Sequence, residues 1–209
     1  MDRRDLFDRT TRNRLLVADV LDGLAPTQWE ADTLCAGWTV RHLAGHLLQP
    51  VLVGFGRFVL VALRHQGDTD ATVDAVARRL ARREPAELVR LLRGHAGDEV
   101  DPPRVGPVGP FTDTCIHLRD LARPLGLDAD VPAADWVEVL DHLTGPAPLP
   151  SLLDPGRLAG ISLRATDADW HWGDSAEVAG TLEALALGLT GRGVVLDELT
   201  GPGVEALRR

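Results

Sequence analysis

The sequence predicts an α+β protein in which a helical bundle precedes a small α/β domain. Over residues 1–145, apolar residues recur at the spacing of amphipathic helices, with charged residues between them. After the proline-rich run at residues 145–150, two short segments have the composition of strands. With 209 residues, 44% of them hydrophobic, the chain can bury a core of this size. We therefore expect the bundle over residues 1–145 and the α/β domain over residues 151–209.

The first two helices have clear start and stop signals. Apolar residues over 5–24 share one helical face, and the pattern ends near Gly23 and Pro26. Thr39 can N-cap a second helix, whose leucines would face the core. Pro50 should kink or split that helix, because proline cannot donate the backbone hydrogen bond that a helix interior needs.

Three further helices complete the predicted bundle. Residues 70–83 place valine and leucine on one face and arginines on another, which we expect to be solvated. Pro85 is suited to the first turn of the next helix. Residues 111–123 predict another helix, and residues 135–143 a short helical segment.

The C-terminal domain should contain two strands and a helix. Residues 161–166 and 169–172 predict strands joined at a tight turn, because both are rich in residues that favour strands. The apolar run from about residue 178 to residue 189 predicts a helix. Residues 196–209 are expected to form a short closing segment.

Composition excludes several kinds of chemistry. The net charge of −9 and the pI near 5.2 argue against sequence-independent nucleic-acid binding, which needs clustered Lys and Arg against phosphates. Lys and Tyr are absent, which rules out a Schiff-base lysine, a P-loop lysine and a phenolic general acid. There is no Gly-x-Ser-x-Gly motif either. We therefore expect a small-molecule partner and no nucleic acid.

Other features favour a cytoplasmic protein. Cys35 and Cys115 are too few for a disulfide framework or a thiolate zinc cage, which fits a reducing compartment. Residues 1–5 lack the apolar core of a secretory signal. Arg57 interrupts the apolar run over residues 50–63, which falls short of the roughly 20 residues of a spanning helix. We expect no membrane association.

Two segments carry the candidate site. Asp113 and His117 lie four residues apart on a predicted helix, so both side chains can reach one point. His46 lies beside the Leu43 and Leu47 stripe of the second helix, where a bundle interior would receive it. If these residues meet, they form an open metal site that leaves a coordination position for water, a thiol or a substrate.

Plainer explanations exist for each of these residues. An acid such as Asp113 is favoured near a helix start by the helix dipole alone, and a single His near an apolar stripe often only packs. His42 and His46 also form a pair four residues apart that could bind a metal by themselves. Cys115 should point away from His117 as a small core residue. The remaining histidines are expected at the surface, at helix ends or in a strand: His65, His95, His142 and His171.

The sequence resembles a known family at several places. The resemblance is carried by Trp29, the run at residues 33–41, His46, the Asp113-to-Asp120 segment and the run at residues 123–126. These are similar to the mycothiol-dependent maleylpyruvate isomerase family, within the DinB-like metalloproteins. Residues 165–192 resemble the small α/β domain of the same architecture.

The resemblance implies a DinB-like four-helix bundle that holds one divalent metal, usually zinc, through His46, Asp113 and His117. The isomerases have Glu-x-x-x-His at the second site, whereas this chain has Asp113, which is one methylene shorter. Asp120 is a candidate for orienting an imidazole through a hydrogen bond to the ring nitrogen that does not bind the metal. Simple solvation on a helix surface would explain an aspartate at this position equally well. We assign the candidate catalytic set to His46, Asp113, His117 and Asp120.

The implied function is a metal-dependent thiol transferase or isomerase with mycothiol as cosubstrate. Its partners would be a small-molecule electrophile and a low-molecular-weight thiol, and the protein would be a monomer or homodimer. Two alternatives stay open. One is a non-catalytic ligand-binding or regulatory protein of the same fold, and the other is a metal-dependent hydrolase in which water replaces the thiol.

Overall fold

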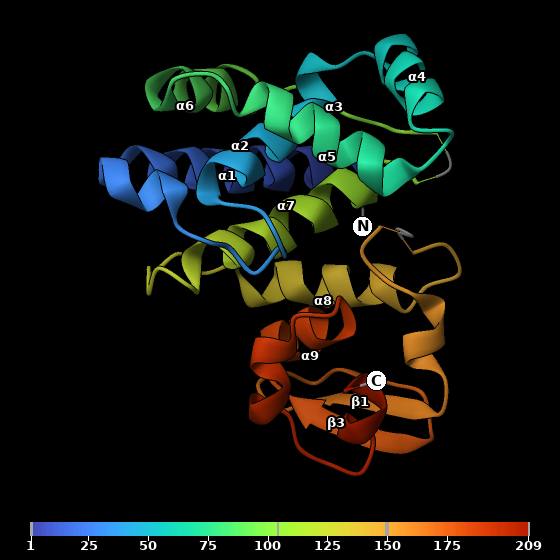
Figure 1. Ribbon diagram of the computed structural model, residues 1–209. Coiled ribbons are helices and arrows are strands. Elements are labelled where there is room, and N and C mark those ends of the chain that lie inside the picture. The colour runs from blue at the N-terminus through green and yellow to red at the C-terminus, as the bar shows by residue number, and fades with distance from the viewer. Residues whose placement is uncertain (1, 104, 149–150, 209) are drawn as a thin grey trace. The chain divides into compact units, whose positions relative to one another are not determined.

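The computed structural model describes residues 2–103, 105–148 and 151–208 (Figure 1). A mostly helical N-terminal region and a small C-terminal sheet with helices confirm the α+β prediction. The chain forms two compact units, Met1–Asp101 with His117–Asp130 and Pro102–Ile116 with Val131–Arg209. The boundary predicted at residues 145–150 stays a prediction, and residues 149–150 lie outside the described part.

The first unit is built from helices, in which α1 packs along α6 and α2 packs along α5 (Figure 1). Gly45 makes the second contact possible, because a Cβ atom there would lie 2.5 Å from the carbonyl oxygen of Ala77. The helices are α1 (Arg3–Asp22), α2 (Val40–Leu47), α3 (Gln49–Leu52), α4 (Phe55–Arg64), α5 (Thr69–Leu80), α6 (Pro85–Gly94) and the last part of α7 (Val108–Ala122), with a 3₁₀ turn, η1 (Pro26–Glu30).

The predicted helix boundaries of this unit are confirmed where a capping residue or a proline sets them. Thr39 is the N-cap of α2, and its backbone N–H donates to Nδ1 of His42 at 3.2 Å. The helix is split at Leu48, Pro50 lies in the first turn of α3, and Pro85 opens α6. The helix predicted over residues 111–123 begins earlier, at Val108.

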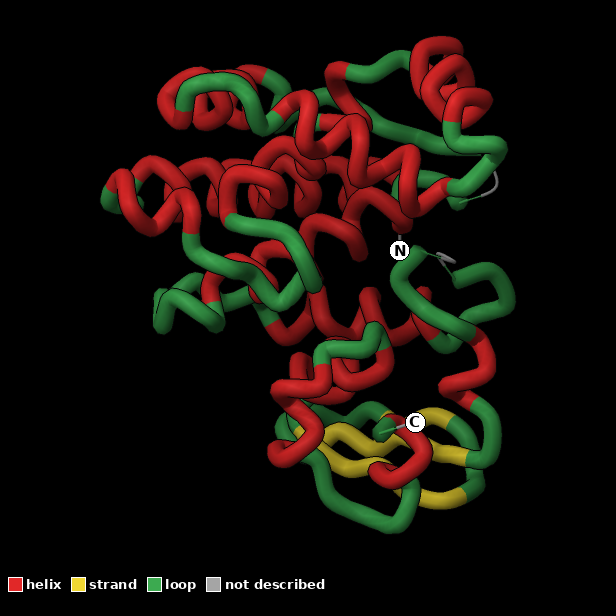
Figure 2. The backbone as a smooth tube through the Cα atoms, in the orientation of Figure 1, coloured by secondary structure: helices red, strands yellow, loops and turns green. Residues whose placement is uncertain are grey.

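The second unit contains a three-stranded sheet in the order β2-β1-β3 (Figure 2). Strand β1 (Ile161–Ala165) pairs antiparallel with β2 (His171–Trp172) and parallel with β3 (Ala176–Gly180). The unit also holds α8 (Ala133–Leu143), α9 (Leu182–Leu189) and α10 (Val204–Leu207), the 3₁₀ turns η2 (Pro155–Leu158) and η3 (Gly193–Glu198), and the first part of α7.

The prediction of one helix from about residue 178 to 189 is wrong in its first part. Residues 176–180 form β3, and α9 begins only at Leu182, after Thr181 caps it by accepting from the N–H of Ala184. Val178 is fully buried. Every residue of α9 except Glu183 is buried too, because this helix contacts α8 on one side and β1 and β3 on the other. A buried strand followed by a buried helix reads as one apolar run.

None of the helices in the described part of the chain combines the length and the apolar character that a membrane crossing requires.

Candidate metal centre

A tight turn leads into the site from the N-terminal side of α2. Its residues run from Cys35 to Trp38, and the N–H of Trp38 donates to the carbonyl of Cys35 at 3.0 Å. Gly37 adopts a φ of 75°, a conformation that residues with a Cβ rarely take, so glycine permits the turn. The hydroxyl of Thr33 donates to the carbonyl of Trp38 at 2.8 Å and closes the loop.

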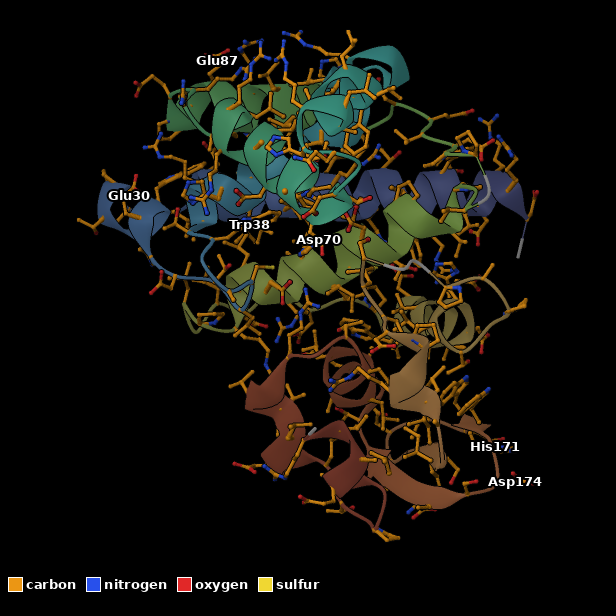
Figure 3. All side chains as sticks on the ribbon, turned by 45° about the vertical axis from the view of Figure 1, so that its right-hand side comes forward. Glu30, Trp38, Asp70, Glu87, His171 and Asp174 are labelled. Carbon is orange, nitrogen blue, oxygen red and sulfur yellow. The ribbon has the colours of Figure 1, made fainter. Side chains whose placement is uncertain are left out.

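Three rings meet where this turn approaches α7. The imidazoles of His46 on α2 and His117 on α7 lie edge to face, with ring centroids 4.7 Å apart. Trp38, labelled in Figure 3, has its ring 5.0 Å from that of His46 and 6.5 Å from that of His117. His117 is 5% exposed, whereas His46 is half-buried. The indole therefore forms one wall beside both imidazoles.

The carboxylate of Asp113 joins the two imidazoles. Asp113 lies one turn before His117 on the continuous helix α7 and is half-buried. One ligand atom from each of His46, Asp113 and His117 lies within 4.8 Å of the others. Donors around a tetrahedral zinc ion are separated by about 3.4 Å, so small side-chain rotations would bring the set to bonding distance. Two imidazoles and a carboxylate are a donor set that divalent zinc accepts.

Asp120 contacts the Nδ1 atom of His117. Its Oδ2 atom is 2.8 Å from Nδ1 of His117, and its side chain is fully buried. The thiol of Cys35 donates to the same oxygen at 3.1 Å, and Sγ lies 3.5 Å from Nδ1 of His117. The N–H of Leu34 donates to the backbone carbonyl of Asp120 at 3.1 Å, which fixes the Cys35 loop on α7. Cys35, His117 and Asp120 thus form a second group of donors.

A polar network fixes Trp38 and His42 beside α5. The indole N–H of Trp38 donates to Asp74 at 2.8 Å, and Arg78 donates to both oxygens of that carboxylate at 2.9 Å. The hydrogen bond from Arg78 lowers the pKa of Asp74 below its usual value. Burial, followed by the charge of Arg78, lowers the pKa of His42. His42 therefore serves the start of α2, and it belongs to neither donor group in the described residues.

The other candidate residues lie elsewhere. Cys115 is fully buried, as expected of a small core residue. His65 and His95 follow the last residues of α4 and α6. His142 lies in the last turn of α8, and His171, labelled in Figure 3, is exposed on β2. None of these histidines belongs to a donor group within the described residues.

Cys35 is the residue that the sequence analysis missed. Its partner Asp120 is 85 residues away, and no local spacing links the two. The only available signal was the Cys-x-Gly-Trp turn, which shows that the loop is tightly built but not what it contacts.

The first half of the chain matches a known protein family model. Residues 14–105 match the family model described as "Mycothiol maleylpyruvate isomerase N-terminal domain". The matched stretch includes His46, whereas Asp113, His117 and Asp120 follow it in the sequence. No curated protein matches the chain.

Two solved structures resemble nearly the whole chain. One is the mycothiol-dependent maleylpyruvate isomerase, at 16% identity and a TM-score of 0.63, over 97% of this chain and 93% of that chain. The other is a histidine-to-alanine mutant of the mycothiol-dependent maleylpyruvate isomerase, at 15% identity with the same coverage and TM-score. At such identity the likeness shows that this chain has the fold of those structures.

Proposed function

We propose that the protein is a divalent-metal-dependent thiol transferase or isomerase that uses a low-molecular-weight thiol such as mycothiol. His46, Asp113 and His117 would hold the metal ion. The observation that carries this proposal is the approach of one ligand atom from each residue to within 4.8 Å of the others. The isomerase N-terminal domain and the isomerase-like fold support the choice of a thiol as cosubstrate.

His117 is well prepared for the role of ligand. With a proton on Nδ1, its ring donates to Asp120 across 2.8 Å, so that Nε2 keeps its lone pair for a cation. Because the Asp120 carboxylate is fully buried, water cannot compete for this contact. Asp120 is therefore a positioning residue, which sets the tautomer and the direction of the imidazole.

Three protein ligands would leave one position of a tetrahedral ion for a small molecule. A divalent ion bound there would lower the pKa of a thiol, so that thiolate exists at neutral pH in a chain without lysine or tyrosine. In a transfer, the cosubstrate thiolate would form a bond to an electrophilic carbon as the bond from that carbon to its leaving group breaks. In a cis–trans isomerisation, it would add to a conjugated double bond, and after rotation about the resulting single bond it would leave again as thiolate. Trp38 would exclude water from one side of this position.

Metal analysis of protein purified without chelator tests the metal site. We expect about one equivalent of zinc or another divalent ion, lost in His46→Ala and in His117→Ala. The matched control is His171→Ala, which removes an exposed histidine of β2 and should leave the metal content unchanged. A wild-type protein without metal affinity, or ligand variants that retain the ion, would contradict the proposal.

Activity assays separate the proposed reaction from its alternatives. The wild-type protein is incubated with electrophilic carbon compounds and activated cis-alkenes, with and without mycothiol. Turnover that requires both the thiol and His46 supports a transferase or isomerase. Turnover with water alone would instead identify a hydrolase. Metal binding without turnover across the set would identify a ligand-binding or regulatory protein.

A further inference from the structure

A cavity in the first unit shares no residue with either donor group. It has a volume of about 380 Å³ and is bordered by α4, α5, α6 and the end of α3. The face of α5 that lines it is different from the face that packs on α2, since Val76 and Arg79 border the cavity whereas Ala77 touches Gly45. A volume of this order is within the range of small-molecule sites.

The charged lining of the cavity is strongly basic. Four arginines and one acid border it, which gives the lining a formal charge of +3 (four minus one) in a chain whose net charge is −9. The acid is Glu87 of α6, which is labelled in Figure 3, and it forms an ion pair with Arg83 at 3.3 Å. The other three arginines of the lining are Arg57, Arg64 and Arg79, and none of them forms an ion pair within the described residues. The cavity therefore presents uncompensated guanidinium groups.

The rest of the lining is apolar. It includes Val61 of α4, Val76 and Leu80 of α5, and Leu91 of α6. Val76 and Leu80 are each 5% exposed, so they belong to the core beneath the cavity. Guanidinium groups beside such a surface suit a molecule with an anionic group on an apolar body, because each part finds its complement.

We propose that this cavity binds a small amphipathic carboxylate. Arg57, Arg64 and Arg79 would bind the carboxylate by charge-assisted hydrogen bonds, and the apolar body would lie against Val61, Val76 and Leu91. The site is independent of the proposed metal centre, since no residue of its lining offers a donor there.

Isothermal titration calorimetry with octanoate tests the proposal on the full-length protein. Octanoate should bind at one site, about tenfold or more tighter than neutral octanamide, because only the carboxylate gains hydrogen bonds to guanidinium groups. Inorganic phosphate should compete poorly, since it lacks the apolar body. No octanoate binding, equal affinity for octanamide, or full competition by equimolar phosphate would each overturn the proposal.

Paired variants locate the site. Arg79→Ala should weaken octanoate binding about tenfold, whereas Arg82→Ala, which removes an exposed arginine outside the lining, should not. Val61→Trp should fill the cavity and abolish binding. Val59→Trp changes a residue of the same helix that is 37% exposed and does not line the cavity, so this variant should still bind octanoate. Circular dichroism and the midpoint of thermal unfolding verify that each variant folds. Folded Arg79→Ala and Val61→Trp proteins that bind octanoate like the wild type would place the ligand elsewhere and contradict the proposal.

A metal-site variant keeps this proposal separate from the proposed function. Octanoate affinity should be the same in wild-type protein, in protein treated with chelator and in His46→Ala, because the two sites share no residue. Loss of octanoate binding together with the metal would show that the carboxylate binds at the metal centre, and that result would overturn the assignment to this cavity.

Discussion

The imidazole of His117 and the carboxylate of Asp120 are joined at 2.8 Å within one turn of α7, and both side chains are buried. A buried carboxylate held against one ring nitrogen determines which nitrogen keeps a free lone pair. The same ring lies edge to face with that of His46, at a centroid distance of 4.7 Å. This relationship makes His117 the best-positioned ligand of the candidate metal centre.

Asp120→Asn is expected to weaken zinc binding by about 10- to 100-fold, because an amide is a poorer acceptor than a carboxylate for the Nδ1 proton. Competition with a chromophoric chelator measures the affinity. Asp128→Asn, which changes an exposed carboxylate shortly after α7, should leave the affinity unchanged. An Asp120→Asn protein that binds zinc as tightly as the wild type would show that this contact does not tune the ligand.

Cys35→Ala distinguishes the two donor groups that share His117. If His46 and Asp113 complete the site, the variant should keep one equivalent of zinc, with an affinity changed at most about fivefold by the loss of the thiol's hydrogen bond to Asp120. Cobalt-substituted protein gives a second readout, since a thiolate ligand adds a strong near-ultraviolet charge-transfer band. Loss of zinc in Cys35→Ala, or such a band in the wild type, would instead place the ion between Cys35, His117 and Asp120.

Gly45→Ala should destabilise the first unit by about 1–3 kcal/mol, because the added methyl group would meet the backbone of Ala77 in α5 and of Ala81 directly after it. Urea unfolding at neutral pH measures the change. Gly56→Ala in α4 is the matched control: no atom lies within 4 Å of its Cβ position, and alanine there should be neutral or stabilise by up to about 1 kcal/mol. If both variants unfold at the wild-type midpoint, close packing of α2 on α5 is not required.

His142 should make the protein less stable in mild acid. Burial lowers its pKa below the ordinary value of 6.5, so the unfolded chain takes up a proton more readily than the folded protein as the pH falls below about 6.5. The free energy of unfolding should therefore decrease between pH 7 and pH 5, and it should decrease less in His142→Gln. His171→Gln, at an exposed position, should follow the wild type. Identical pH profiles for His142→Gln and wild type would contradict this assignment.

Local chemistry accounts for what the sequence predicted well. Thr39 and Pro85 set helix starts through capping and through the fixed φ of proline, and both act within one turn. The i,i+4 spacing of Asp113 and His117 likewise follows from one helix. Strand β3 was missed because its pairing with β1 is a tertiary contact, and a short buried strand has no periodicity that separates it from a buried helix.

Contacts between distant segments explain the remaining misses. Cys35 reaches Asp120 only because the turn through Gly37 folds back onto α7. Arg79 was expected on a solvated face of its helix, and it is exposed, yet it also borders the basic cavity beside α4. Neither relationship leaves a local pattern, since each depends on how separate helices pack.

Anomalous diffraction at the zinc edge, from crystals of the protein grown with zinc, locates the metal ion. If His46, Asp113 and His117 hold the ion, one strong peak lies within about 2.0–2.2 Å of a nitrogen of His46, a nitrogen of His117 and an oxygen of Asp113. A peak bonded instead to the sulfur of Cys35, or no peak near His117 at all, would show that these three residues are not the metal ligands.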